Sequence, residues 1–403
     1  MSNSKITLFI CLLLSFAVGA SINSLGSSNL AFQRAFGASN EVLGRIQMLF
    51  FIGGGAIVVA GGWLTERLGE KKAAGLALTC LTLGSLAVAS ATSLRQVFVS
   101  ALLVGLGSIW ASVSYSVIVA KRYADRRQSM FSIITLSETT SAILQPLAFS
   151  AWFAHVESSA GASWVAVFYG LAMLMLVELL VLSLAWKPAP EARGERLEID
   201  AKESTPARQV IFSGALWLIG VCVLLHGLFQ IGFVFWIGPY YAARLGITPA
   251  QAAVFVSVSS AGFFPGRALL GWLSARFKIP NLVLLGIASG TGTVMICLAV
   301  LSGSYLLALV FTFLEGLFVA GDAPAMLSFV GERFVSRPAL AYALYAGFGQ
   351  VGAAGGGYVV GALGDWIGHI QQAFWVVPIV SGSLCLLAFA WHTLERRGAR
   401  AVS

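Results

Sequence analysis

The feature that most constrains this chain is a series of about twelve apolar segments, separated by short polar stretches. A helix of roughly 20 apolar residues spans the hydrocarbon core of a bilayer. That core offers no hydrogen-bond partner to an open backbone, so each segment is expected to be helical. We therefore predict an all-α polytopic membrane protein with twelve transmembrane helices. The predicted spans are approximately 6–33, 43–65, 73–93, 97–120, 129–153, 162–186, 210–236, 250–274, 281–302, 304–330, 339–364 and 372–393.

Composition excludes the main alternatives to a membrane protein. The chain is 58% hydrophobic and only 10% charged, whereas soluble domains carry about a quarter charged residues. A soluble enzyme, a disordered protein and a disulfide scaffold are therefore excluded. The net charge of +8 does not indicate a nucleic-acid partner, because the basic residues form short clusters between spans and not one face. The five cysteines lie inside apolar runs without CxxC spacing, so we expect no metal site and no cofactor.

The basic residues predict the orientation in the membrane. If the N-terminus is cytoplasmic, 20 of the 25 Lys and Arg residues fall on the cytoplasmic side, as the positive-inside rule requires. We therefore expect a multi-pass protein of the cell inner membrane with both termini in the cytoplasm. The first segment also resembles a signal peptide, with Lys5 before an apolar stretch that ends at Ala20. Cleavage there would remove one of a regular series of spans, so we expect the segment to be retained.

One long polar stretch divides the spans six and six. It covers residues 187–209 and contains three prolines, which is typical of a solvated linker. The predicted domains are therefore an N-terminal half at 1–186, a cytoplasmic linker at 187–209 and a C-terminal half at 210–403. An internal repeat supports this division. The second span ends in the sequence GWLTERLGEKK, and the eighth span, the second of its half, ends in GWLSARFK.

The first copy of this repeat resembles the loop signature of the major facilitator superfamily, G-x-x-x-D-R/K-x-G-R/K-R/K. The residues that match the signature are Gly62, Arg67, Gly69 and Lys71. Glu66 stands where the signature has an aspartate. The second copy keeps two of these positions as Gly271 and Arg276. The resemblance implies two pseudo-symmetric six-helix halves that alternate access around a central site. It also implies that charge pairs between these residues at helix ends stabilise one conformation and break in another. The alternative is that they are only the charged residues of a solvated loop.

Some stretches are loosely similar to the fucose-permease-type sugar symporters of that superfamily. They include Trp236-Ile237-Gly238-Pro239-Tyr240 in the seventh span and Gly266-Arg267 in the eighth. That group typically carries an acid in the first and the fourth span, and this sequence has neither. Drug exporters of the superfamily usually carry a glycine-proline motif in the fifth span, where this chain has Leu144-Gln145-Pro146.

Ionisable residues inside spans are the candidates for coupling, because burying a charge in a bilayer costs about 2.5–3.5 kcal/mol on insertion scales. Glu138 lies near the middle of the fifth span among hydroxyl residues, and we expect it to be a reversible proton carrier. The alternative is a structural Glu that these hydroxyls or a neighbouring helix satisfy. Asp322 follows Gly321 and precedes Pro324, where we expect a kink, and it could pair with Arg267. The remaining candidates for proton coupling, each with a structural alternative, are Glu178, His226 and Glu315.

The predicted solute site lies between the first and seventh spans, which occupy equivalent positions in the repeat. Amides offer donors and acceptors and aromatic rings offer apolar faces, as pockets require. The cavity candidates are Asn23, Asn29, Gln230, Phe233, Trp236, Tyr240 and Arg267. Core packing remains the alternative for each aromatic residue.

We reject two nucleotide-site readings. Residues 347–352 fit the dinucleotide pattern G-x-G-x-x-G, but they lie inside an apolar span and lack a preceding strand, so we interpret them as a helix-packing face. The chain also has no P-loop motif, so a proton or ion gradient, or a partner, must supply the energy. We predict a monomeric secondary transporter of a small polar or amphipathic organic solute, acting as a proton symporter and not as an enzyme. The alternatives are a drug or metabolite efflux antiporter and a membrane receptor or scaffold without transport.

Overall fold

The computed structural model describes residues 3–123, 127–156, 163–186, 206–334 and 338–402, and its regular elements in these ranges are helices. Most of the predicted linker at 187–209 lies outside the described residues. The helices before it are α1 (Asn3–Ser27), α2 (Asn29–Phe36), α3 (Asn40–Leu68), α4 (Glu70–Ala89), α5 (Leu94–Arg122), α6 (Arg127–Val156) and α7 (Ser163–Ala185). Those after it are α8 (Ala207–Ile211), α9 (Gly214–Leu245), α10 (Pro249–Phe277), α11 (Asn281–Leu301), α12 (Tyr305–Val319), α13 (Asp322–Arg333), α14 (Pro338–Ile367), α15 (Ile370–Ala373) and α16 (Val376–Val402).

These helices correspond to the predicted spans, and the all-helical membrane fold is confirmed. The first span consists of α1 and α2, and the tenth consists of α12 and α13. Ten helical segments among the described residues are long and apolar enough to cross a membrane. The other two long helices, α6 and α14, have 30 residues each. Both are rich in glycine, hydroxyl or amide residues, which lowers their mean hydropathy.

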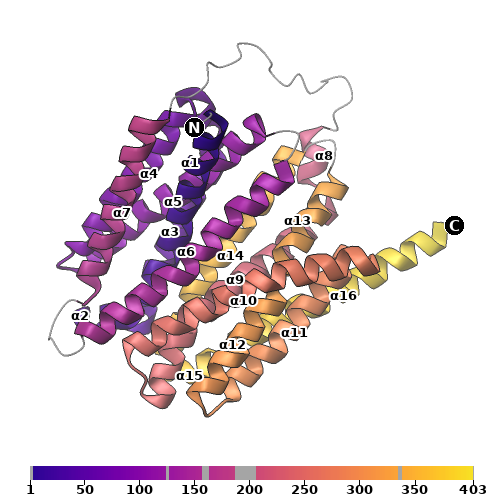
Figure 1. The fold of residues 1–403 in the computed structure, drawn as a ribbon. Helices are drawn as coiled ribbons and strands as arrows, with labels where there is room; N and C mark the ends of the chain where they lie inside the picture. Colours follow the sequence, from indigo (N-terminus) through magenta and orange to yellow (C-terminus); the bar gives the residue numbers. More distant parts are fainter. Residues whose placement is uncertain (1–2, 124–126, 157–162, 187–205, 335–337, 403) are drawn as a thin grey trace.

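Figure 1 shows the helices before the linker, indigo to magenta, beside those after it, salmon to yellow. We call them the first set (α1–α7) and the second set (α8–α16). The sets meet chiefly where α3 packs against α14 and where α6 packs against α10. We call one end of the bundle the basic end, because it carries Lys5, Arg67, Lys71, Arg122 and Arg276. The opposite end carries α2, α15 and the start of α3, and we call it the α15 end.

Glycines allow α3 and α14 to approach closely near the α15 end. A Cβ atom placed on Gly44 of α3 would lie 2.8 Å from the carbonyl oxygen of Gly357. Close backbone approach between small residues is a common way for membrane helices to associate. Gly352 and Gly356 pack closely against the backbone of α9, whereas a Cβ atom on Gly347 would meet nothing within 4 Å. Most of the glycine run that produced the dinucleotide-like pattern therefore forms a packing face.

The predicted kink at Asp322 is present as an interruption between two helices. α12 ends at Val319, and α13 begins at Asp322 after a turn through Ala320 and Gly321. Pro324 lies in the first turn of α13, where its missing N–H is tolerated. The interruption leaves Asp322 fully buried at the start of α13.

Candidate functional site

Glu138 lies on α6, which packs against α1, α5 and α10. Its Oε2 atom accepts a hydrogen bond of 3.4 Å from the hydroxyl group of Tyr115 on α5. Ser112 in turn donates to the Tyr115 oxygen over 3.2 Å. This hydrogen bond is long, so it leaves the Glu138 carboxyl able to change partners.

The hydroxyl residues around Glu138 do not satisfy its carboxyl group in this structure. Ser137 donates to the carbonyl oxygen of Leu12 on α1 over 2.9 Å. Thr139 and Thr140 donate to carbonyl oxygens four residues earlier on α6. Serine and threonine often bond back to their own helix in this way. The hydrogen bonds of these hydroxyls therefore give no support to a structural Glu held by them, whereas the contact with Tyr115 on α5 fits a structural Glu held by a neighbouring helix.

Arg267 connects the second set of helices to this site. It extends from α10 and donates a 3.2 Å hydrogen bond to the hydroxyl of Thr139, the neighbour of Glu138. Arg267 also interacts electrostatically with Glu138. A second hydrogen bond joins the two sets nearby, from Ser257 of α10 to the carbonyl oxygen of Ile143 over 2.8 Å. Glu138 is therefore an acid at the interface between the sets.

The predicted pairing of Asp322 with Arg267 is wrong. Asp322 contacts His226 of α9, whose Nδ1 atom lies 3.3 Å from Asp322 Oδ2. Arg267 contacts Thr139 on α6 instead. The sequence places Arg267 and Asp322 in the same half, but only the rotation of each helix decides which neighbour a side chain reaches.

Glu315 is a second buried acid close to Asp322. It is fully buried, and its Oε2 atom accepts a 3.0 Å hydrogen bond from Ser259 of α10. Glu315 and Asp322 are close enough to interact electrostatically. One oxygen of each carboxyl group lacks a hydrogen-bond partner among the described residues. Both acids, with Ser259 and His226, lie within the second set.

Glu178 is isolated on α7 in the first set. Its side chain is 1% exposed. Neither carboxyl oxygen has a hydrogen-bond partner in the part of the chain that the structure describes. It therefore differs from Glu138 and Asp322, which each have a polar contact on another helix.

Amide side chains occupy the region between α1, α2, α3 and α9. Asn29 donates to the carbonyl oxygen of Phe235 on α9 over 3.0 Å, and Gln47 of α3 donates to Asn29 Oδ1 over 3.0 Å. Asn23 donates to the carbonyl oxygen of Gly19 on its own helix. A cavity of about 10 Å³, lined by Asn29, Phe235 and their neighbours, lies between α1 and α9. It has room for roughly one water molecule.

Several buried amide atoms lack partners among the described residues, and sequence reasoning did not single out most of these residues. They are Oε1 of Gln47, Gln230 and Gln350, and both polar atoms of Gln145. Only Gln230 was a predicted cavity residue. Gln145 was considered only in the comparison with drug exporters, and Gln350 lay within the rejected dinucleotide pattern. The usable signal was an amide inside an apolar span, the same signal that nominated Asn23 and Asn29.

The structure places the three predicted cavity aromatics in packing contacts. Trp236 is fully buried and donates to the carbonyl oxygen of Gly357 over 3.0 Å. Phe233 and Tyr240 both pack against Phe374, with ring centroids 6.2 and 5.0 Å apart. In this conformation these rings therefore join α9 to its neighbours in the second set.

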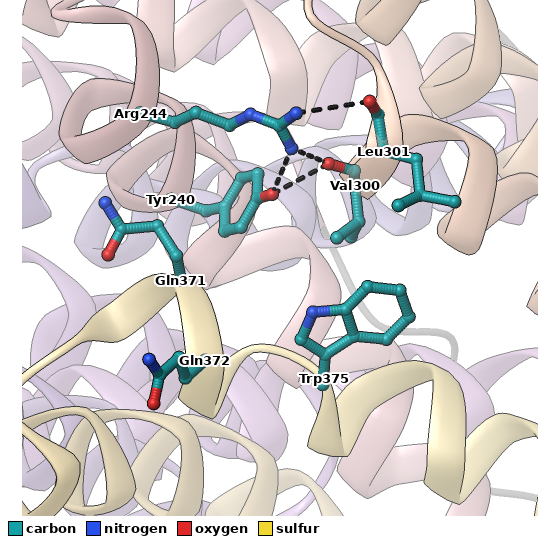
Figure 2. Close-up of a pocket in the computed structure, with 7 residues that line it drawn as sticks. All are labelled: Tyr240, Arg244, Val300, Leu301, Gln371, Gln372 and Trp375. Carbon is teal, nitrogen blue, oxygen red and sulfur yellow. Dashed lines mark hydrogen bonds between the residues drawn. The ribbon is translucent and has the colours of Figure 1, made fainter.

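Tyr240 also lines a surface pocket of about 320 Å³ at the α15 end (Figure 2). Arg244 dominates this pocket, and its guanidinium donates to Tyr240 over 2.6 Å and to Leu301 over 3.1 Å. It also donates to the carbonyl oxygen of Val300. These carbonyl groups end α11, so Arg244 caps that helix and joins it to α9.

The signature residues at the basic end make contacts within their own set. Lys71 donates to the carbonyl oxygens of Ser183 and Trp186 at the end of α7, over 2.8 and 2.6 Å. Arg67 lies over the ring of Trp63 at 4.1 Å, and Gly69 has a φ of +81° between α3 and α4. Gly62 lies within α3, Gly271 and Arg276 lie in α10, and the side chain of Glu66 is outside the described part of the chain.

The comparisons with known proteins agree with this architecture. The sequence model of the Major Facilitator Superfamily matches residues 8–299. The curated proteins gave no match. A solved bacterial homologue of the human lysosomal transporter Spinster, inward-facing and unoccupied, has a TM-score of 0.76 at 13% identity, covering 97% of this chain and 95% of that chain. A D-xylose–proton symporter has a TM-score of 0.73 at 16% identity, with 96% and 97% covered. The nucleoside transporter NupG has 0.72 at 15%, with 96% and 99% covered.

Proposed function

The chain belongs to the major facilitator superfamily and is a secondary transporter of the membrane, and we propose that it couples a small neutral polar solute to protons. Members of this superfamily transport and typically catalyse no reaction. We further propose that the protein lies in the cell inner membrane with its basic end in the cytoplasm. The support is the positive-inside bias of its Lys and Arg residues.

We propose that residues 1–186 and 210–403 rock against each other as two rigid halves. The contacts between α3 and α14 support this, because they run from Asn40 near the α15 end to Gly54 in the middle of α3. Such contacts hold the two sets together at the α15 end. With the basic end in the cytoplasm, this arrangement corresponds to a carrier closed to the outside.

Glu138 is our candidate proton carrier, and its position between the sets is the observation that carries the proposal. A proton on Glu138 removes the negative charge that Arg267 faces from the other set. The interaction between the halves then depends on protonation, which is what coupling requires. Asp322, Glu315 and His226 interact inside one set, so their protonation acts on the interface less directly.

Buried amide side chains on α3, α6, α9 and α14 support a neutral solute that donates hydrogen bonds. Gln47, Gln145, Gln230 and Gln350 each leave an amide oxygen without a partner among the described residues. Such oxygens accept hydrogen bonds from hydroxyl groups. The similar D-xylose and nucleoside transporters are named for solutes that carry several hydroxyl groups, which agrees with this chemistry. We therefore propose a sugar-like or nucleoside-like solute for this chain.

The test uses the purified protein in proteoliposomes with an imposed pH gradient, acid outside. Radiolabelled D-xylose and uridine are the probes, after a thermal-shift screen of neutral sugars, nucleosides, organic acids and amines. We expect the wild-type protein to accumulate a neutral probe, and Glu138→Gln to lose accumulation while counterflow exchange survives. Glu178→Gln is the matched control, because Glu178 is also a buried acid of the first set but lacks a polar partner among the described residues. Accumulation that persists in Glu138→Gln rejects the proton assignment.

A further inference from the structure

At the α15 end, α3 begins directly against the last turns of α14. The carboxylate of Asp365 on α14 accepts hydrogen bonds from the backbone N–H groups of Asn40, over 3.1 Å, and Glu41, over 2.7 Å. The side-chain amide of Asn40 also donates to it over 3.0 Å. Ser39 accepts the next backbone N–H, that of Val42. A helix cannot satisfy its own first four N–H groups, so α3 depends on the other set for two of its partners.

The charge of Asp365 suits this position. The N-terminus of a helix carries a partial positive charge that a carboxylate stabilises. Burial raises the pKa of the Asp365 carboxyl, but hydrogen bonds from Ser39, Glu41 and Asn40 outweigh burial and hold this pKa below its ordinary value. Asp365 is therefore ionised at neutral pH.

A second hydrogen bond crosses the interface about two turns earlier on α14. The hydroxyl group of Tyr358 on α14 donates to Glu41 Oε1 over 3.1 Å. The same Glu41 oxygen pairs with Arg45 of α3 at 2.5 Å. The Glu41 charge is thus satisfied by Arg45 and Tyr358, so it does not oppose Asp365 strongly. Close packing at Gly44 and Gly357 continues the contact.

We propose that Asp365 is a latch that holds the two sets of helices together at the α15 end by capping α3 across their interface. The cap exists only while α3 and α14 are in contact. Opening at this end would expose the N–H groups of Asn40 and Glu41 to water and release the Asp365 carboxylate. The latch therefore stabilises the conformation described here and must break in every transport cycle. Its link to transport rests on the proposed rocking motion, whereas the contact itself does not.

Hydrogen exchange read by mass spectrometry tests the latch without any solute. The full chain in lipid nanodiscs at pH 7 is compared with Asp365→Ala, Asp365→Asn and Glu332→Gln. Glu332 is a matched control, because it is an exposed carboxylate that accepts one 3.0 Å hydrogen bond from Asn281 within the second set. We expect Asp365→Ala to raise exchange in residues 39–47 about fivefold, the ratio expected for loss of a helix cap. Asp365→Asn should give a smaller increase, because it keeps an acceptor oxygen but loses the charge.

Peptides from α4, which takes no part in the contact, report whether a variant has unfolded. If Asp365→Ala raises exchange there too, Asp365→Asn decides the outcome. Unchanged exchange at residues 39–47 in the folded Asp365 variants overturns the proposal, as does an equal rise there in Glu332→Gln. Because no solute or pH gradient is used, this result is independent of whether Glu138 carries protons.

Discussion

Glu138 and the Asp322–Glu315 pair are both acidic sites inside the membrane region, but different parts of the molecule hold them. Glu138 contacts Tyr115 of its own set and faces Arg267 of the other. Asp322 and Glu315 find their partners, His226 and Ser259, inside the second set. A proton gained at the first site changes the interface between the two sets, which is proposed to open and close. A proton gained at the second changes the inside of a unit that is proposed to move as one body.

This difference separates coupling from stability. An acid that couples protons to the proposed movement must be able to exchange its partners. The hydrogen bond from Tyr115 to Glu138 is 3.4 Å long and therefore weak enough to break. An acid buried within one set must keep its partners, because a lone charge there is costly. We therefore expect substitutions at Glu138 to affect coupling and substitutions around Asp322 to affect folding.

The largest predicted effect on stability is at His226. His226→Ala removes the contact to a fully buried carboxylate and should lower the free energy of unfolding by about 3 kcal/mol. His226→Gln keeps a hydrogen-bond donor near Asp322 and should lose less. Thermal unfolding in detergent measures both. Gradient-driven accumulation per folded protein should remain, and its complete loss in His226→Gln would show that the second site also couples.

Sequence reasoning found the spans, the interruption at Asp322 and the acids, because each follows from local patterns. An apolar run predicts a span, and a Gly-Asp-Ala-Pro sequence predicts a broken helix. It did not find the partners. Whether Arg267 reaches Asp322 or Thr139 depends on how α10 is rotated against α6 and α13, and one sequence contains no such distances. Tyr115 of the fourth span was not singled out as a partner of Glu138 for the same reason.

The latch, too, could not be predicted from the sequence. Asp365 lies just past the predicted eleventh span and has the appearance of an ordinary loop acid. Its role depends on the start of α3, more than 300 residues earlier in the chain. Ser39, in contrast, is a recognisable helix cap from sequence, because serine before an apolar run is a common start signal. Local caps are therefore predictable, whereas caps supplied by another set of helices are not.

A smaller effect of opposite sign is predicted at Glu178. Both of its carboxyl oxygens lack hydrogen-bond partners among the described residues, so it carries the penalty of an unsatisfied buried group. Glu178→Met has a similar volume and should raise the free energy of unfolding by about 1–2 kcal/mol. Thermal unfolding measures this gain, with Glu178→Gln as the polar control. A loss of stability in Glu178→Met would reveal a partner for this acid, and a loss of coupling would place it beside Glu138.

The smallest predicted effect concerns pH at the latch, and it tests whether pH acts through the buried acids alone. Hydrogen bonds lower the pKa of Asp365 in the latched state. The carboxylate therefore stabilises the latch fully at any pH above its ordinary pKa. That stabilisation is lost only when the pH falls through the lowered pKa. Among the described residues, Glu41, Arg45 and Tyr358 face this contact, and His369 follows Asp365 by four residues in the chain. Replacing His369 with Gln removes the imidazole that is nearest in the chain. In this variant, exchange at residues 39–47, corrected for the intrinsic pH dependence of exchange, should stay constant between pH 5.5 and 7.5. Solute accumulation measured over the same range should still change, because the proposed coupling depends on Glu138 and not on the latch. A latch that loosens in parallel with transport would mean that Asp365, and not only the acid between the sets, senses the proton gradient.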